Sequence, residues 1–153
     1  MQTNQFDLEF EKITTAMVEI AFEFVDFNKD IIDTIFILGS IEDEIINYKF
    51  FYNINGVYLS AYKINENQQI EFDISDERLS AIQRLGNNEL QKMNTLFLNH
   101  KRDVPTLCKI LFFPKSGKFE CKLNYDLQYS NSDMKGFHDI FLEWLDEQKI
   151  VQY

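Results

Sequence analysis

The chain has 153 residues, of which 45% are hydrophobic and 15% aromatic, so it is long enough for one packed core and too apolar for a disordered tail. Its 25 acidic and 15 basic residues leave a formal net charge of −10, which repels nucleic-acid backbones and anionic lipid surfaces and attracts basic partners. These values predict a single domain over residues 1–153, with no direct binding to nucleic acid or membrane.

The first residues show no targeting signal. Acidic residues are spread through the N-terminal segment, without the basic and then apolar regions of a signal peptide. No stretch reaches the roughly 18 apolar residues that a membrane span needs. We therefore expect a cytoplasmic protein whose two cysteines, Cys108 and Cys121, are reduced.

The first predicted element is an amphipathic helix. Apolar side chains recur every three or four positions, and acidic side chains occupy the other face, which is typical of a helix packed on a core. The apolar positions are Phe6, Phe10, Ile13, Met17, Ile20 and Phe24.

Three strands are expected next, because "DTIFILGSIE", "EIINYKFFYN" and "GVYLSAYKI" are rich in β-branched and aromatic residues. The polar breaks between them are too short for parallel crossovers, so the strands must form an antiparallel meander. The segment that follows, "NENQQIEFDIS", is either a fourth short strand or an ordered crossing.

A second helix is expected to begin at Ser75, an N-cap residue with two acidic residues in the next turn, where the helix dipole favours them. Helical spacing of apolar residues continues to Phe97. The segment "LGNNE" allows either a kink or a break into two shorter helices at Gly86. Pro105 ends the segment.

Residues 104–126 predict a hairpin with two possible registers. A two-residue turn at Ser116 and Gly117 buries no lysine, and we favour it. A type I turn through Lys115 and Ser116, with Gly117 as the bulge residue, shifts the register by one and turns other side chains inward. The first option places Cys108, Ile110 and Phe112 beside Tyr125, Leu123 and Cys121; the second brings Leu111 and Phe113 inward.

In the favoured register Cys108 and Cys121 lie roughly 13 Å apart along the strands. A disulfide cannot span that distance. The prediction is therefore two separate thiols.

The last predicted element is a helix in "SNSDMKGFHDIFLEWLDEQKIV", with Ser130 to Asp133 resembling a capping box. The complete order is α-β-β-β-α-β-β-α. This order predicts an α+β single domain, in which a three-strand meander and a hairpin form an antiparallel sheet with helices packed mainly on one face. The packing side of the last helix is Phe137, Ile140, Phe141, Trp144 and Leu145.

The sequence offers no catalytic, cofactor or metal motif. His100 and His138 lie outside any zinc-ligand spacing, and no glycine-rich phosphate loop or nucleophile elbow is present. The acidic clusters are interpreted as solvated turns and helix ends. We therefore predict no catalytic residue, no cofactor, no metal and a protein that is not an enzyme.

A binding module is the remaining interpretation. Tyrosine and tryptophan beside charged residues are typical of protein-binding hot spots. We expect these aromatic residues on the solvated face of the sheet and along the last helix: Tyr48, Tyr52, Tyr58, Tyr62, Tyr125, Tyr129 and Trp144.

Three motifs follow one another in the second half of the chain: a Pro-x-x-Cys strand, a Gly-Lys turn and a strand that ends in Tyr-Asp. With the element order across nearly the whole chain, they resemble the YezG-like family of bacterial immunity proteins, the antitoxins of polymorphic toxin systems. Thr106 stands where that family commonly has Trp, and "SIEDE" replaces the acidic Gly-Gly break of its first hairpin. The motif residues are Pro105, Cys108, Gly117, Lys118, Tyr125 and Asp126.

The resemblance implies a non-catalytic protein that binds a cognate toxin, often a basic nuclease, and blocks its active cleft inside the producing cell. An acidic surface suits such a partner, because opposite net charge speeds association. We predict the toxin-binding surface at Asp126, Tyr129 and Asp133, and second at the turn of Glu42, Asp43 and Glu44.

A secretion chaperone is the alternative. Small acidic chaperones of this kind share the element order and hold an extended segment of an exported cargo as homodimers. Their strands are usually richer in leucine than these, so the immunity protein, as a monomer, is the preferred interpretation.

Overall fold

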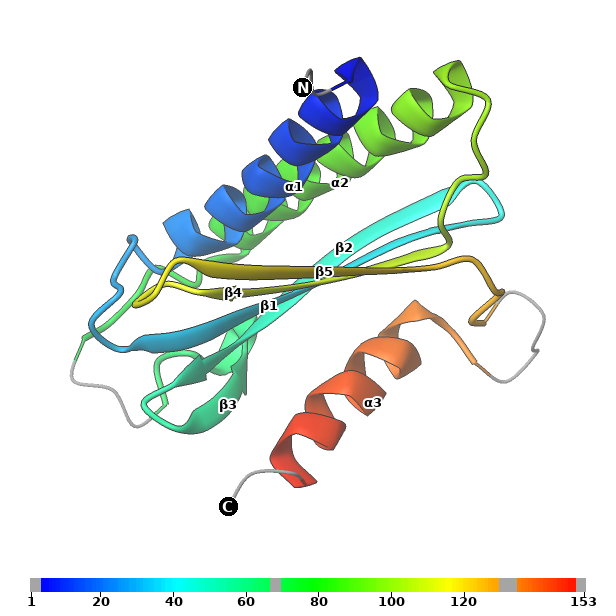
Figure 1. The fold of residues 1–153 in the computed structure, drawn as a ribbon. Coiled ribbons are helices and arrows are strands. Elements are labelled where there is room, and N and C mark those ends of the chain that lie inside the picture. Colours follow the sequence, from blue (N-terminus) through cyan, green and yellow to red (C-terminus); the bar gives the residue numbers. More distant parts are fainter. Residues whose placement is uncertain (1–3, 67–69, 130–134, 151–153) are drawn as a thin grey trace.

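The computed structural model describes residues 4–66, 70–129 and 135–150. It confirms the predicted α+β single domain and its α-β-β-β-α-β-β-α order (Figure 1). No helix in these ranges combines the length and the apolar character that a membrane crossing requires. The elements are α1 (Gln5–Phe24), β1 (Ile32–Glu42), β2 (Ile45–Ile54), β3 (Val57–Ser60), the 3₁₀ turn η1 (Ala61–Lys63), α2 (Asp76–Asn99), β4 (Leu107–Phe113), β5 (Lys118–Asn124) and α3 (Phe137–Ile150).

The five strands form one antiparallel sheet in the order β3-β2-β1-β4-β5. The meander occupies one half, and the β4–β5 hairpin pairs with the free side of β1. Two-residue turns join the meander strands: Asp43 and Glu44 have φ of 52° and 64°, and Asn55 and Gly56 have φ of 51° and 87°. Positive φ at both central residues is the mark of a type I′ turn, whose twist matches that of the strands.

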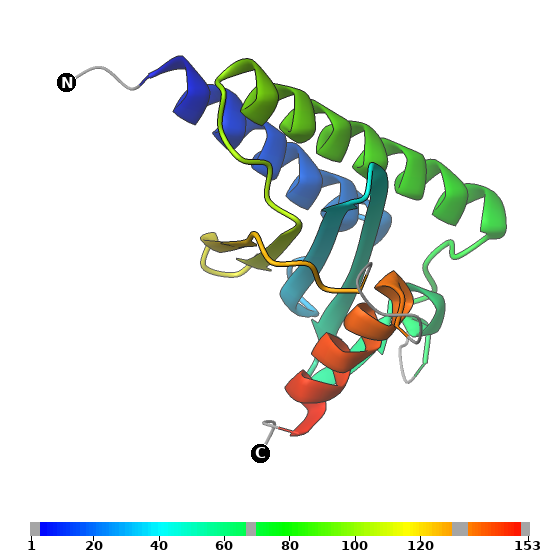
Figure 2. The same ribbon diagram turned by 90° about the vertical axis from the view of Figure 1, so that its right-hand side faces the viewer.

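Helices cover both faces of the sheet. Helices α1 and α2 lie side by side on one face, and α3 lies on the other (Figures 1 and 2). The alternation along β1 explains this arrangement, because Ile35 and Ile37 pack towards α1 and α2, whereas Phe36 and Leu38 pack towards α3. Since β1 is apolar on both sides, it requires cover on both sides.

Two tyrosines of β2 connect the sheet to α1. The hydroxyl of Tyr48 donates to the carbonyl oxygen of Met17 at 2.8 Å, and that of Tyr52 donates to the carbonyl oxygen of Ala21 at 2.6 Å. Both side chains are completely buried. Burial raises the pKa of both hydroxyls far above the usual range, so both donors stay protonated.

Helix α2 runs without a break through Gly86. The expected kink or break is absent because this glycine is a packing residue: a Cβ built there would lie 2.2 Å from ring atoms of Tyr48. The N-cap prediction is confirmed, since the Ser75 hydroxyl accepts from the backbone N–H of Arg78 at 3.3 Å. Gly86 therefore sets how closely α2 approaches β2.

The β4–β5 hairpin has neither predicted register. Phe113 pairs with Lys118, so residues 114–117 form the turn. The backbone N–H of Ser116 bonds to the carbonyl oxygen of Phe113 at 3.2 Å, which places Pro114 at the second position of a turn, where its fixed φ is favourable. The turn therefore begins earlier than either prediction had it.

The correct register moves the cysteines together. Cys108 pairs with Leu123 and Ile110 with Cys121, which makes the cysteines diagonal neighbours with their sulfur atoms 3.7 Å apart. The predicted separation of roughly 13 Å is wrong, and so is the argument that distance forbids a bond between them. The predicted set of inward-facing side chains is still correct, because the observed register differs from the favoured one by two residues and not by one.

Two other segments differ from expectation or lie outside the description. Residues 70–75 form a crossing without a strand, where the side-chain amide of Asn65 bonds to both the N–H and the carbonyl oxygen of Phe72 at 2.7 and 3.0 Å. Helix α3 begins at Phe137, and the predicted capping box from Ser130 to Asp133 lies outside the described residues.

The close approach at Gly86 generates a stability prediction. Gly86→Ala adds helix propensity worth about 1 kcal/mol, yet overpacking against the fully buried ring of Tyr48 costs about 3 kcal/mol, the upper end of the usual range. We expect a net loss of about 2 kcal/mol in urea unfolding, whereas Asn88→Ala, at an exposed position of α2, leaves stability equal or slightly higher. A stabilising Gly86→Ala would contradict the packing role.

The buried tyrosines predict sensitivity to alkali. The pKa of each hydroxyl is higher in the folded chain than its value of about 10 in the unfolded chain. Their contribution to the free energy of unfolding is therefore complete below a pH of about 10 and is lost as the pH rises beyond it. The Tyr48→Phe/Tyr52→Phe variant should lose about 1 kcal/mol per hydrogen bond at pH 8 and show a weaker further loss near pH 11. Urea unfolding at both pH values measures this, and Tyr62→Phe, 70% exposed, should behave as wild type.

Candidate functional site

The β1–β2 turn and the segment directly after β5, which hold the described residues of the two predicted contact regions, lie at the same end of the sheet (Figure 1). Glu42, however, is not at the surface. Its carboxylate accepts hydrogen bonds from the backbone N–H of Gln128 at 3.1 and 3.0 Å and from that of Tyr129 at 3.1 Å. The side chain is only 2% exposed. The interpretation of Glu42 as a solvated turn residue is therefore wrong: Glu42 anchors the segment after β5.

Tyr129 is also buried. Its hydroxyl lies 2.8 Å from that of Ser40, and its ring packs beside Phe137 at the start of α3. Among the predicted contact residues, Asp43, Glu44 and Asp126 are exposed, and Asp133 lies outside the described residues.

The predicted solvated row of aromatic residues is largely interior. Tyr48 and Tyr52 point into the α1 and α2 side of the core, and Trp144 packs between α3 and the sheet. Tyr58 is partly buried, so of the predicted set only Tyr62 and Tyr125 are exposed. The prediction failed for two reasons. Helix α3 covers the face on which Tyr129 and Trp144 lie, whereas Tyr48 and Tyr52 lie on the opposite face, which packs against α1 and α2.

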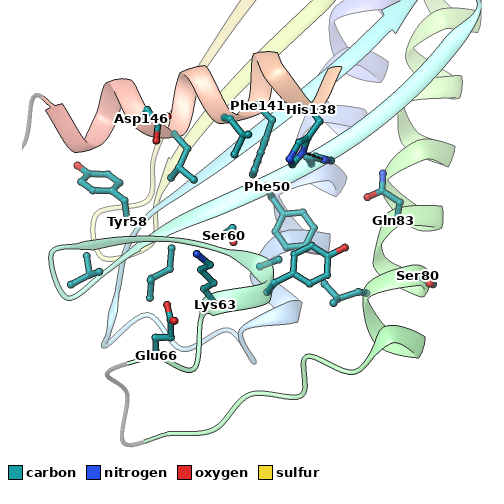
Figure 3. A pocket seen from close by; sticks show the side chains of 18 of the residues that line it. Phe50, Tyr58, Ser60, Lys63, Glu66, Ser80, Gln83, His138, Phe141 and Asp146 are labelled. Atoms are coloured by element: carbon teal, nitrogen blue, oxygen red, sulfur yellow. Dashed lines mark hydrogen bonds between the residues drawn. The ribbon is translucent and has the colours of Figure 1, made fainter. Parts of the chain in front are cut away.

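A groove of about 1150 Å³ opens beside β3, between α2 and α3 (Figure 3). His138, Phe141 and Asp146 come from α3, Ser80 and Gln83 come from α2, and Ser60 and Lys63 lie at the base. The groove thus has a helix on each side and the β2–β3 edge with η1 as its floor. The remaining lining residues are Lys49, Phe50, Gly56, Val57, Tyr58, Leu59, Ala61, Tyr62, Glu66, Asp76, Leu79, Arg84, Asn87, Asn88, Leu142, Leu145 and Lys149.

Apolar side chains of this groove are exposed to solvent. Tyr62 is 70% exposed, Val57 40% and Leu142 39%. They come from η1, β3 and α3, and together they make a surface that an apolar side chain of a partner can cover.

The floor of the groove contains an open strand edge. Strand β3 ends at Ser60, opposite Phe51, whereas β2 extends back to Ile45. The two-residue turn makes Ile54 and Val57 a hydrogen-bonded pair, so every second residue of β2, including Phe50, directs its backbone groups to the same side.

A side chain of α2 bonds to this edge. The amide Nε2 of Gln83 donates to the carbonyl oxygen of Tyr48, as the N–H of an added strand would. This contact confirms the direction of the β2 backbone groups. Beyond Ser60, no further strand pairs with β2 in the parts of the chain that the structure describes.

Lys49 connects the sheet to α3 at the inner end of the groove. Its ammonium lies 2.6 Å from Nδ1 of His138 and 5.3 Å from the ring centroid of Phe141. Donation by the ammonium requires an unprotonated Nδ1. Burial lowers the pKa of Lys49, and the aromatic face offsets part of the lost hydration.

The charges divide between the groove and the outer face of α3. Among the described residues, four cations and three acids line the groove, so this lining is nearly neutral: Lys49, Lys63, Arg84 and Lys149 against Glu66, Asp76 and Asp146. Along α3, Asp139, Glu143, Asp146 and Glu147 are all exposed at helical spacing. The acidic surface therefore borders the groove and does not fill it.

The groove pairs no nucleophile with a base in the described ranges. Ser60 and Ser80 make no hydrogen bond to a histidine or a carboxylate there, and no group of three or more potential metal ligands occurs in the same ranges. What the arrangement offers is hydrogen bonding, apolar contact and charge, the elements of a binding surface.

No protein-family model matches this chain, and no curated protein matches it. The function must therefore be argued from the residues and from the site.

Sequence reasoning missed the groove. The third strand was expected to extend over "GVYLSAYKI", and its early end at Ser60 opens the edge. Leu142 was a possible signal, since it is a leucine outside the packing positions of its helix. The partners on α2 had no sequence signal, because only the fold brings them beside β3.

The buried carboxylate of Glu42 generates a prediction. Glu42→Ala leaves the N–H groups of the buried Tyr129 and the partly buried Gln128 without their charged acceptor, so we expect a loss of about 2–3 kcal/mol in the free energy of unfolding measured in urea. Asp43→Asn, next in the same turn but exposed, should be neutral or slightly stabilising, because Asn suits positive φ. Equal stability of the two variants would contradict the anchoring role.

Proposed function

We propose that this protein is a cytoplasmic immunity protein that binds a cognate bacterial toxin domain and blocks it. The resemblance of the sequence to the YezG-like family motivates the proposal, and the groove between α2 and α3 is the observation that carries it. The toxin domain is a basic one, and the binding protein acts as a monomer without cofactor or metal.

The open edge of β2 supports binding of an extended segment. A peptide that lies along an exposed sheet edge gains main-chain hydrogen bonds, while pockets beside the edge select its side chains. Here β2 continues beyond the end of β3, and Tyr62, Val57 and Leu142 offer apolar contact. We therefore assign a loop or terminal segment of the toxin to the groove.

The charge distribution supports a basic partner. The chain carries a net charge of −10, and the exposed acids of α3 run beside the groove. Opposite charge at the rim of an interface raises the association rate, and the effect weakens with salt. We assign this steering to α3, because the groove itself is nearly neutral.

A secretion-type chaperone is the second candidate, and the same groove favours it. A groove with an open strand edge also suits an extended cargo segment. The two functions differ in partner and in assembly, because the chaperone acts as a homodimer on an exported protein, whereas the immunity protein acts on a toxin whose activity it abolishes.

A matched pair of substitutions tests the groove. Leu142→Arg places a charge at a groove position that is 39% exposed, and Leu98→Arg makes the same change on α2 outside the groove, at 59% exposure. Tagged wild type and both variants are used to capture partners from the source cell, and the captured domain is then purified for affinity and activity measurements. We expect Leu142→Arg to weaken binding at least tenfold and Leu98→Arg to change it less than twofold.

The same experiment separates the alternatives. A captured basic domain whose toxic activity disappears at one equivalent of this protein supports immunity. An exported cargo without such activity, held by a dimer on size exclusion, favours the chaperone. Equal binding by both arginine variants refutes the groove as the binding site, and the Asp43→Asn/Glu44→Gly variant then tests the turn that the sequence suggested.

A further inference from the structure

The two cysteines meet across the β4–β5 hairpin. Cys108 lies opposite Leu123, and Cys121 lies opposite Ile110, so their side chains stand diagonally on the same face of the sheet. Their sulfur atoms are 3.7 Å apart. A disulfide needs about 2.05 Å, so the sulfurs must close a gap of roughly 1.7 Å.

The strand that has to move is the one best able to do so. Among the described strands, β5 lies at the edge of the sheet and pairs only with β4, whereas β4 is held between β1 and β5. The hairpin turn at residues 114–117 lies next to it along the chain. A small shift of β5, together with rotation of the two side chains, brings the sulfurs together without disturbing the centre of the sheet.

The two thiols differ in access and in acidity. Cys108 is 2% exposed, while Cys121 is only partly buried. The hydrogen bond from Cys108 lowers the pKa of the Cys121 thiol, and the same bond, with burial, raises the pKa of the Cys108 thiol. The more accessible sulfur is thus the one that forms the thiolate more readily, and the thiolate is the form that attacks a disulfide.

We propose that Cys108 and Cys121 are a thiol pair that converts reversibly to a cross-strand disulfide by exchange with a low-molecular-weight disulfide of the glutathione class. This inference does not depend on the proposed function. The groove lies at the β3 edge, and the cysteine pair lies at the opposite half of the sheet.

The exchange proceeds in two steps. The Cys121 thiolate attacks one sulfur of the external disulfide, forms a mixed disulfide and releases one external thiolate. The Cys108 thiol then loses its proton, attacks the sulfur of Cys121 and displaces the second external thiolate, which takes up the proton. Two protein thiols are oxidised to one disulfide, and one external disulfide is reduced to two thiols.

The Cys108–Cys121 disulfide would join the edge strand β5 covalently to β4. It closes a loop from Cys108 to Cys121 around the turn, which restricts the unfolded chain. The oxidised protein should therefore melt at a temperature about 5–10 °C higher than the reduced protein. The β4–β5 hairpin is then more stable under oxidising conditions, with the disulfide, than under reducing conditions, without it.

Wild-type protein alone gives the main test. The folded protein is equilibrated with mixtures of oxidised and reduced glutathione, its free thiols are alkylated after acid quenching, and intact mass is measured. We expect a monomer that is about 2 Da lighter, carries no adduct and resists alkylation, with reversal by dithiothreitol. Two alkylated thiols under excess oxidised glutathione, a stable glutathione adduct or a disulfide-linked dimer would each overturn the proposal.

Two variants test the order of the steps. Cys108→Ala keeps the attacking thiol and removes the resolving one, so a glutathione adduct should accumulate on Cys121. Cys121→Ala keeps only the buried thiol, so adduct formation should be at least tenfold slower. Equal rates for the two variants, checked as folded by circular dichroism, would contradict the roles assigned to the two sulfurs.

Discussion

The contact between Tyr48 and its two neighbouring helices fixes the geometry on which the rest of the structure depends. The hydroxyl of Tyr48 bonds to the carbonyl oxygen of Met17 in α1, while its ring packs against the backbone of α2 at Gly86. One side chain of the sheet thereby determines the distance of both helices from it. Tyr52 repeats the contact to α1 one turn later, at Ala21, so the helix cannot slide along the strand without breaking two hydrogen bonds. Leaving a buried hydroxyl without a partner destabilises the fold by more than one such hydrogen bond stabilises it. The two bonds therefore select this position of α1 along β2 against shifted ones.

Because two helices occupy one face, the third has to cover the other. The rings of Phe36 and Phe51 stack at 4.4 Å between centroids, and Trp144 of α3 meets both edge-on at 5.5 and 5.2 Å. This cluster holds α3 over β1 and β2, close to the β3 edge. The groove is lined by α2 and α3, which lie on opposite faces of the sheet, at the point where the short strand β3 ends (Figure 3). The groove therefore follows from the packing of both faces combined with a strand that ends early.

The sequence contained most of the fold and little of the site. Periodicity predicted the helices and strands because each is a local pattern, and the short breaks required antiparallel pairing. The same local patterns misplaced the tyrosines, since alternation separates two faces without showing which of them is covered, and here helices cover both. Glu42 shows the limit most clearly: in the sequence it resembles the acidic residues beside it, and only the segment at Gln128, far along the chain, makes it a buried anchor. Long-range contacts of this kind have no local signature.

The hairpin shows how a small error in register changes chemistry without changing the fold. A shift of two residues returns every side chain to the same face, so the apolar pattern of β5 fits the predicted and the observed register equally well. The burial pattern therefore cannot distinguish them, but the sulfur atoms can, because a displacement of two residues moves Cys121 from a remote rung to the diagonal neighbour of Cys108. What decides the register is the turn, where Pro114 suits the second position and Gly117 takes a positive φ of 77°. Redox chemistry at Cys108 and Cys121 is thus specified by turn residues several positions away, and no reading of the cysteines themselves reveals it.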